Sequence, residues 1–256
     1  MTAVPFASFA RAAQPTVSQH ERLRASSRWL RLAEGRAVYE LGFTLAAWPL
    51  LLRAPRGDGH TVLVLPGLLA TDLSTAVLRG YLAQLGYDVR AWELGRNLPS
   101  FERRSALAAR VDDLFAETGA QVSLVGWSLG GIYARDLART RARRVRSAIT
   151  LGSPLAFEPA DRITRDPAPL RGSPEMPFTS IYSKSDGVVD WRRCLVRENA
   201  RSENIAVTCA SHLGLGVNAA VLWATADRLA QPEGLFTPFD RGGPFGLAYG
   251  PAREGA

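Results

Sequence analysis

Cysteine and histidine are scarce in this sequence of 256 residues. The two cysteines, Cys194 and Cys209, do not have C-x-x-C spacing, and no histidine pair beside them would complete a zinc site. One disulfide between them stays open, but two small buried thiols in a cytosolic protein explain the same residues with less assumption. The sequence therefore predicts no metal site.

Long apolar runs and secretory features are also missing. The first twenty residues do not combine a basic start with an apolar core, so we expect a cytoplasmic protein. The longest apolar stretch, residues 38–52, contains Glu40 and Pro49 and falls short of the ~20 residues that span a bilayer. It indicates an apolar helix packed on the domain, with a helix in a membrane interface as the alternative. Peripheral membrane contact would then involve residues 20–52.

Lysine is almost absent: the net charge of +7 comes from arginine, and Lys184 is the only lysine. Arginines gather in residues 11–36 and 135–146. Such a basic surface can meet nucleic acid or an anionic membrane. No aromatic-interleaved basic motif or recognition helix accompanies the charge, so nucleic-acid binding is not expected, and a solvated face explains the arginines.

Short apolar runs rich in β-branched residues alternate with segments of helical length. The expected strands are residues 61–65, 87–92, 121–126, 147–151, 178–183 and 204–209. The expected helices are residues 72–85, 101–117, 128–140 and 217–230. This alternation predicts an α/β fold with a mainly parallel, doubly wound sheet.

The chain length suits one such domain and is too short for two. We expect the core over residues 56–231 and an N-terminal helical extension over residues 1–55 that covers part of the sheet or the site. Prolines forbid a long helix in residues 153–177, so this segment is expected to form a short lid or a plain surface loop. The Gly/Pro-rich tail, residues 232–256, is expected to be loosely ordered.

The strongest motif is Gly-Trp-Ser-Leu-Gly-Gly at residues 126–131, between an expected strand and an expected helix. A nucleophile on a sharp strand-to-helix turn has strained backbone geometry and needs small residues two positions before and after it. Gly126 and Gly130 meet this need. We therefore predict that Ser128 is a catalytic nucleophile.

A serine hydroxyl needs an adjacent base, which is normally histidine. His20 lies in the extension and His60 precedes the first expected strand, so His212, in a loop of small residues after the last strand, is the predicted base. The orienting acid should lie between serine and histidine, after a strand. Asp186 is favoured because it directly follows its strand in a Ser-Asp-Gly turn, whereas Asp190 is read as a turn or helix-cap residue.

An oxyanion hole needs two backbone N–H groups near the nucleophile. Gly67, in the loop after the first expected strand, permits close backbone approach. The amides of Leu68 and Leu129 are the predicted donors. The same loop also reads as a simple turn in which Thr71 or Asp72 caps the next helix, and both readings can hold at once.

These motifs together resemble the α/β-hydrolase superfamily and, in its short core, the bacterial esterase and lipase branch. The resemblance covers about residues 60–230 and is carried by PGLLATD, GWSLGG, SDGVVDW and SHLGL in the expected order. Two positions depart from the commoner lipase pattern: Pro66 stands where many lipases have histidine before the glycine, and Trp127 where many have histidine before the serine. Neither change removes a catalytic atom.

The resemblance and the residues imply a carboxylesterase or lipase that forms an acyl-enzyme on Ser128 and uses no cofactor. The expected substrate is a small-molecule or lipid ester, with short to medium acyl esters before long-chain lipids, because apolar residues surround the predicted site; they are Leu68, Leu69, Trp127, Leu129, Leu213 and Leu215. Core packing explains some of these leucines equally well. Acyl transfer and thioester cleavage use the same triad and stay open. A non-catalytic binding protein of the same fold is disfavoured by the intact Ser, His and Asp. The sequence leaves the oligomeric state undetermined.

Overall fold

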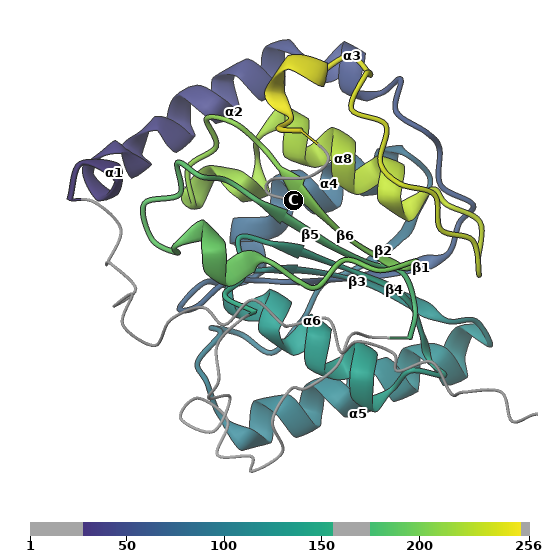
Figure 1. Ribbon diagram of the computed structural model, residues 1–256. Helices are drawn as coiled ribbons and strands as arrows, with labels where there is room; N and C mark the ends of the chain where they lie inside the picture. Colours follow the sequence, from purple (N-terminus) through teal and green to yellow (C-terminus); the bar gives the residue numbers. More distant parts are fainter. Residues whose placement is uncertain (1–27, 156–174, 252–256) are drawn as a thin grey trace, which may run out of the picture.

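The computed structural model of the protein describes residues 28–155 and 175–251 (Figure 1). Six parallel strands form one sheet in the order β2-β1-β3-β4-β5-β6. They are β1 (Thr61–Leu65), β2 (Asp88–Arg90), β3 (Val122–Trp127), β4 (Val145–Leu151), β5 (Phe178–Tyr182) and β6 (Ser202–Ala206). Each expected strand is present, within a few residues, so the predicted doubly wound parallel sheet is confirmed.

Helices cover both faces of the sheet. The four long helices of the core are α4 (Ala76–Gln84), α5 (Phe101–Thr118), α6 (Leu129–Thr140) and α8 (Ala219–Leu229). Helices α4 and α8 lie on one face, and α5 and α6 lie on the other (Figure 1). Short 3₁₀ turns complete the core: η2 (Asp72–Thr75), η3 (Trp191–Cys194), η4 (Leu213–Gly216) and η5 (Gly246–Ala248).

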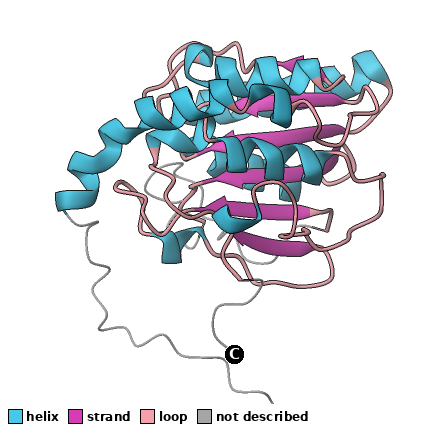
Figure 2. Ribbon diagram, turned by 90° about the horizontal axis from the view of Figure 1, so that it is seen from above, coloured by secondary structure: helices cyan, strands magenta, loops and turns pink. Residues whose placement is uncertain are grey.

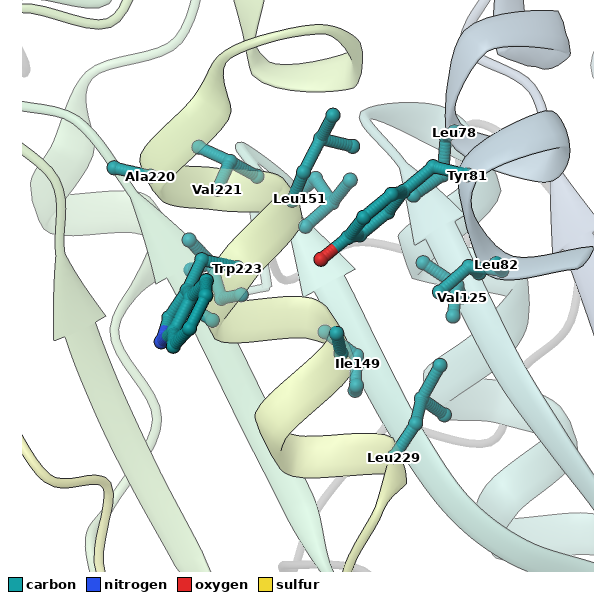
Figure 3. Packing of buried hydrophobic residues seen from close by; sticks show 14 of the residues in the cluster. Leu78, Tyr81, Leu82, Val125, Ile149, Leu151, Ala220, Val221, Trp223 and Leu229 are labelled. Carbon is teal, nitrogen blue, oxygen red and sulfur yellow. The ribbon is translucent and has the colours of Figure 1, made fainter. Parts of the chain in front are cut away.

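The apolar core forms two layers, one on each side of the sheet. Successive strand residues point to opposite faces, so Val62 and Val64 pack with α4 and α8 while Leu63 and Leu65 pack with α5 and α6. Figure 3 shows Tyr81 of α4 in the first of these layers, near the apolar side chains of α8. Because both faces are covered, β1 is apolar and buried almost throughout rather than alternating.

The N-terminal extension runs as α1 (Arg28–Leu32), η1 (Ala33–Arg36), α2 (Ala37–Ala46) and α3 (Trp48–Leu51). It lies on the α8 side of the sheet (Figure 1 and Figure 2), and α2 contacts α8 and η4. Trp48 packs edge-to-face on Tyr81, with the ring centroids 5.7 Å apart. The outer side of α2 faces solvent: Tyr39 is 82% exposed and Phe43 62%. The apolar stretch therefore packs on the domain along one side only.

Within the described ranges, no helix combines the length and apolar character needed to cross a membrane. Most of the expected lid segment lies outside the described residues, since only residues 153–155 and 175–177 of it are placed.

Two sequence expectations differ from the structure. Both cysteines are free, and Cys209 is exposed while only Cys194 is buried. The expectation of a loose tail is not met over residues 232–251, where Phe239 and Tyr249 are buried with ring centroids 4.7 Å apart. Glycine and proline content suggested looseness, but the aromatic residues between them supply enough apolar surface to pack on the core.

Candidate active site

Ser128 occupies the turn between β3 and α6. Its φ is 53° and its ψ is −116°, a combination that non-glycine residues rarely adopt. Its amide donates a hydrogen bond of 2.8 Å to the Leu151 carbonyl at the end of β4. The side chain is half-buried. Ser128 thus lies at the carboxyl edge of the sheet, on a backbone held away from ordinary geometry.

The glycines around Ser128 are required by close backbone contacts. A Cβ added to Gly126 would overlap the carbonyl of Gly130, two residues beyond the serine. A Cβ on Gly130 would overlap the Leu65 carbonyl at the end of β1. The turn can therefore fit between β1 and the start of α6 only with glycine at these two positions.

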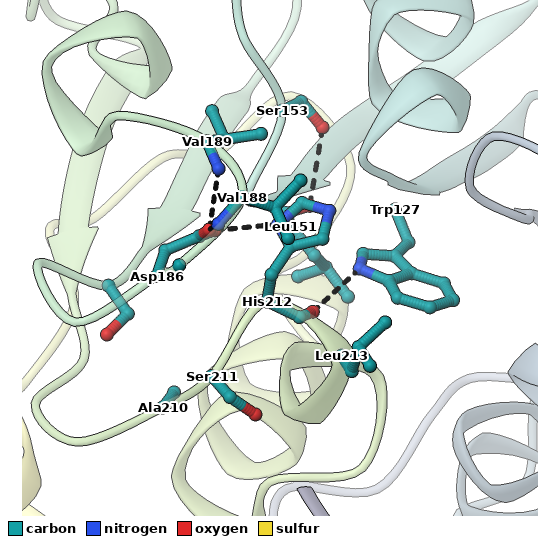
Figure 4. A network of polar contacts seen from close by, with 12 residues as sticks. Trp127, Leu151, Ser153, Asp186, Val188, Val189, Ala210, Ser211, His212 and Leu213 are labelled. Carbon is teal, nitrogen blue, oxygen red and sulfur yellow. Dashed lines mark hydrogen bonds and ion pairs between the residues drawn. The ribbon is translucent and has the colours of Figure 1, made fainter. Parts of the chain in front are cut away.

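His212 and Asp186 meet at the same edge of the sheet (Figure 4). His212 Nδ1 lies 2.7 Å from Asp186 Oδ2, and both side chains are buried. The other carboxylate oxygen, Oδ1, accepts the amides of Val188 at 2.8 Å and Val189 at 2.7 Å. These bonds hold one oxygen of Asp186 while the other faces the imidazole. A proton on Nδ1 leaves Nε2 available to accept one.

Trp127 ties the His212 loop to the serine turn. Its indole Nε1 donates to the His212 carbonyl at 3.1 Å (Figure 4). Among the described residues, no hydrogen bond joins the Ser128 hydroxyl to His212. The structure therefore brings Asp186 and His212 together, and Ser128 directly follows Trp127, whose indole is bonded to the His212 backbone. The serine–histidine contact is often long in unliganded enzymes and tightens when substrate binds.

The loop after β1 passes beside Ser128. A Cβ on Gly67 would lie 3.5 Å from the Ser128 Cβ. In the described part of the chain, the amides of Leu68 and Leu129 have no hydrogen-bond partner, so both stay available to a ligand. Asn97, which the sequence analysis did not single out, donates from Nδ2 to the Pro66 carbonyl at 2.7 Å and holds this loop.

The structure also shows what the side chains of two other aspartates, Asp190 and Asp72, bind. Asp190 caps η3, where it accepts the Arg192 amide at 3.0 Å, as its reading as a cap residue predicted. Asp72 does not cap a helix; its carboxylate accepts the amides of Trp92 at 2.9 Å and Glu93 at 3.1 Å. Across the described ranges, no group of three His, Cys, Asp or Glu residues could hold a metal ion.

Gly152 is a site residue that sequence reasoning missed. It follows β4 with a φ of 57°, and its amide donates to the Ile181 carbonyl at 2.9 Å. A Cβ here would lie 3.2 Å from Asp186 Oδ2 and 3.3 Å from His212 Nδ1. The signal in the sequence was a glycine directly after a strand. Its requirement becomes clear only from the structure, which places the Asp186 and His212 side chains beside it.

A second Ser-His-Asp chain lies before β1 and within β3. His60 Nδ1 lies 2.5 Å from Asp58 Oδ1, and His60 Nε2 lies 2.9 Å from Ser123 Oγ. Ser123 is fully buried, and its hydroxyl also contacts Ser147 at 2.9 Å. Burial lowers the pKa of His60 and outweighs the opposing hydrogen bond to Asp58. Because no substrate can reach Ser123, this chain joins strands rather than forming a site.

No protein-family model matches the sequence, and no curated protein matches it. Solved structures do match. Lipase B of Aspergillus fumigatus is 17% identical with a TM-score of 0.56 and is matched over 68% of this chain and 53% of its own. The chain thus spans about half the length of that lipase.

Two further structures match more of their own length. A structure described for the metagenome-derived lipolytic enzymes LipS and LipT is 16% identical, with a TM-score of 0.52, and the match covers 68% of this chain and 93% of that one. The esterase domain of a Rhodothermus marinus protein is 15% identical, with a TM-score of 0.50, over 69% of this chain and 88% of that one. Together with the parallel sheet and the serine turn, these likenesses show that the chain has the fold of the α/β-hydrolase superfamily.

Proposed function

We propose that the protein is a serine hydrolase that cleaves carboxylic esters, with Ser128 as nucleophile, His212 as base and Asp186 as the acid that orients the histidine. The observation that carries the proposal is the 2.7 Å contact between a buried carboxylate and an imidazole, at the sheet edge where a serine sits on a strained turn. Fold alone does not decide function, so the proposal rests on these side chains.

In the proposed reaction, His212 accepts the Ser128 proton as the hydroxyl oxygen attacks the ester carbonyl. The amides of Leu68 and Leu129 stabilise the oxyanion, an effect typically worth ~10²- to 10³-fold in kcat for one donor. His212 then protonates the departing alcohol and leaves an acyl-enzyme. Water then attacks the acyl-enzyme with the same help from His212, which releases the carboxylic acid product and restores the Ser128 hydroxyl. Asp186 holds the imidazole tautomer throughout.

The leucines around the candidate site divide into two groups. Leu68, Leu69 and Leu213 are more than half exposed, so they can contact an apolar acyl chain. Leu129 and Leu215 are buried in the core layers, which supports core packing, the alternative explanation of these two leucines. The exposed set supports small-molecule or lipid esters with an apolar acyl group.

The test is hydrolysis of p-nitrophenyl esters over a range of acyl lengths, with a fluorophosphonate label read by mass spectrometry. We expect Ser128→Ala to lose turnover by at least ~10⁴-fold, together with the label, while its circular dichroism stays that of the wild type. The matched control is Ser123→Ala, which removes the other histidine-bonded serine and should keep both. Loss of the label in Ser123→Ala instead of Ser128→Ala, or full activity in Ser128→Ala, would overturn the assignment.

The same assay separates hydrolysis from the related acyl-transfer reactions. Thioester substrates test for sulfur as the leaving atom, and an added primary alcohol tests whether an acceptor other than water takes the acyl group. Preference for oxygen esters with water as acceptor supports the proposal. A dominant ester product with the alcohol would redirect it to acyl transfer.

Peripheral membrane contact through residues 20–52 is part of the proposal. The described part of this segment exposes Trp29, Leu32, Tyr39 and Phe43 on α1 and α2. Helix α2 contacts η4, which begins directly after His212. Apolar side chains with arginines nearby suit an anionic lipid surface, which would then lie next to the candidate site.

A further inference from the structure

Two glutamates of the N-terminal extension reach the loops that carry the acid and the base. Glu34 lies in η1 and is 7% exposed. Glu40 lies in α2, with a side chain that is 8% exposed. Buried carboxylates are costly unless hydrogen bonds satisfy them, so what these two groups bind requires an explanation.

Glu34 binds the backbone of both loops with one carboxylate. Its Oε1 accepts the Gly187 amide at 2.7 Å and the His212 amide at 3.1 Å, while Oε2 accepts the Leu213 amide at 2.9 Å. Gly187 directly follows Asp186 in the chain. The carboxylate therefore links the peptide next to the acid with the peptide of the base itself.

Glycines make room for these contacts. A Cβ on Gly187 would overlap the Leu30 carbonyl and lie 2.7 Å from Glu34 Oε1. A Cβ on Gly214 would overlap the carboxylate of Glu40. The loops around the acid and the base are thus shaped to receive the extension.

Arg36 joins the same two loops a second time. Its guanidinium donates to the Ser185 carbonyl at 2.6 Å and to the Ala210 carbonyl at 3.1 Å. These residues precede the acid and the base, respectively. Glu40, in contrast, reaches only the base side, where it accepts the Ser211 amide at 2.8 Å.

We propose that Glu34 is a positioning residue that sets the separation of Asp186 and His212 by binding the backbone of both their loops. This role rests on the proposed hydrolase function, and Glu34 itself touches no reacting atom. Charge-assisted hydrogen bonds from three amides give the carboxylate a fixed place, so the two loops share one rigid anchor. Small errors in the placement of catalytic groups can cost about 10²-fold in rate.

Glu34→Gln keeps the side-chain shape but presents an NH₂ group to at least one backbone amide. We expect kcat to fall about 10- to 100-fold while KM changes less than about 2-fold, because substrate binding does not involve this residue. The matched control is Glu203→Gln. Glu203 is also a buried glutamate that accepts a backbone amide, that of Phe239, but it lies near the start of β6, at the opposite edge of the sheet from the candidate site. It should keep the wild-type kcat even if its Tm falls.

Two kinetic outcomes overturn the proposal: an unchanged kcat in Glu34→Gln, whether or not KM rises, or an equal loss of kcat in Glu203→Gln. If Glu34→Gln does not fold, Glu34→Asp replaces it, since the shorter carboxylate keeps the charge but cannot reach both loops. The same drop in kcat without a change in KM is then expected, and wild-type kcat counts against the role.

A proton NMR measurement separates this proposal from the hydrolase assignment. The imidazole proton shared by His212 and Asp186 should resonate far downfield in the wild type, whether or not the protein turns over any ester, and Asp186→Asn assigns it. We expect the resonance to be lost or broadened in Glu34→Gln and kept in Glu203→Gln. An unchanged resonance in Glu34→Gln overturns the positioning role, while an inert wild type with the expected NMR change would refute only the hydrolase function.

Discussion

At the scale of single residues, the same three residue types occur twice with different consequences. Ser123 lies within β3 and is hydrogen-bonded to His60, which contacts Asp58, whereas Ser128 follows β3 and is assigned to His212 and Asp186 only by our proposal. Ser123 sits within the strand and is fully buried between His60 and Ser147. Ser128 sits on the turn and is only half-buried. Exposure of the serine to solvent, rather than residue type, distinguishes the candidate nucleophile Ser128 from the structural Ser123.

The buried His60 predicts a pH-dependent stability. Burial lowers the pKa of His60 below its ordinary value of 6.5, so below this pH the unfolded chain binds a proton that the folded protein does not. The free energy of unfolding should therefore fall as the pH drops from 7 to 5, by at most about 1.4 kcal/mol per pH unit from this group. Urea unfolding of wild type and His60→Gln measures it, and the variant should show a flatter dependence. Parallel curves for the two proteins would contradict this explanation.

At the scale of elements, α2 has two faces with different partners. Its inner face carries Glu40 and the fully buried Thr44, and it packs on η4 and α8. Its outer face carries Val38, Tyr39 and Phe43, which are all exposed. An apolar surface on the solvent side of a helix is typical of a binding surface. The helix that carries it contacts, on its inner face, the turn that follows His212.

The outer face of α2 predicts binding to lipid vesicles. The double variant Tyr39→Ser with Phe43→Ser should lower co-sedimentation with phosphatidylcholine–phosphatidylglycerol vesicles at least about 10-fold, since each aromatic side chain contributes about 1.5 kcal/mol or more when buried. Leu247→Ser is the control, because Leu247 is an exposed apolar residue as well but lies in η5, away from α2 in the chain. Equal sedimentation of the double variant and the wild type would remove the membrane proposal.

At the scale of the whole molecule, both ends of the described chain pack on the same side of the sheet, in the apolar layer that contains α4 and α8. The extension covers the loops that carry Asp186 and His212. The C-terminal segment reaches back to β6 and α8: the Phe239 amide donates to Glu203 of β6 at 3.0 Å, and the Tyr249 hydroxyl donates to the Ala220 carbonyl of α8 at 2.8 Å. The core therefore includes residues from outside the strand-helix alternation.

The C-terminal segment predicts a measurable share of the stability. Phe239→Ala should lower the free energy of unfolding by about 3 kcal/mol, because a buried aromatic ring and its contact with Tyr249 are lost. Leu235→Ala, at a position that is 60% exposed in the same segment, should change it by less than about 0.5 kcal/mol. Denaturant unfolding measures the free energy of unfolding of both variants. A small decrease of similar size in the two would show that the segment packs only loosely.

The sequence by itself determined the features that depend on neighbouring residues. Strand-helix alternation follows from local apolar periodicity, and the serine turn follows from the steric needs of Gly126 and Gly130 beside Ser128. Chain order and loop composition pointed to His212 and Asp186, which the structure brings to within 2.7 Å. Their catalytic roles remain a prediction that the labelling and turnover assays test.

Only the tertiary structure decided what depends on contacts between distant segments. Glu34 and Gly187 are 153 positions apart, so no local pattern could pair them. Gly152 is required because two side chains from other loops pack against it, and the packing of Phe239 depends on the surface that β6 and α8 present. Local backbone preferences are set by a few adjacent residues, whereas the place of a loop is set by the packing of the whole chain.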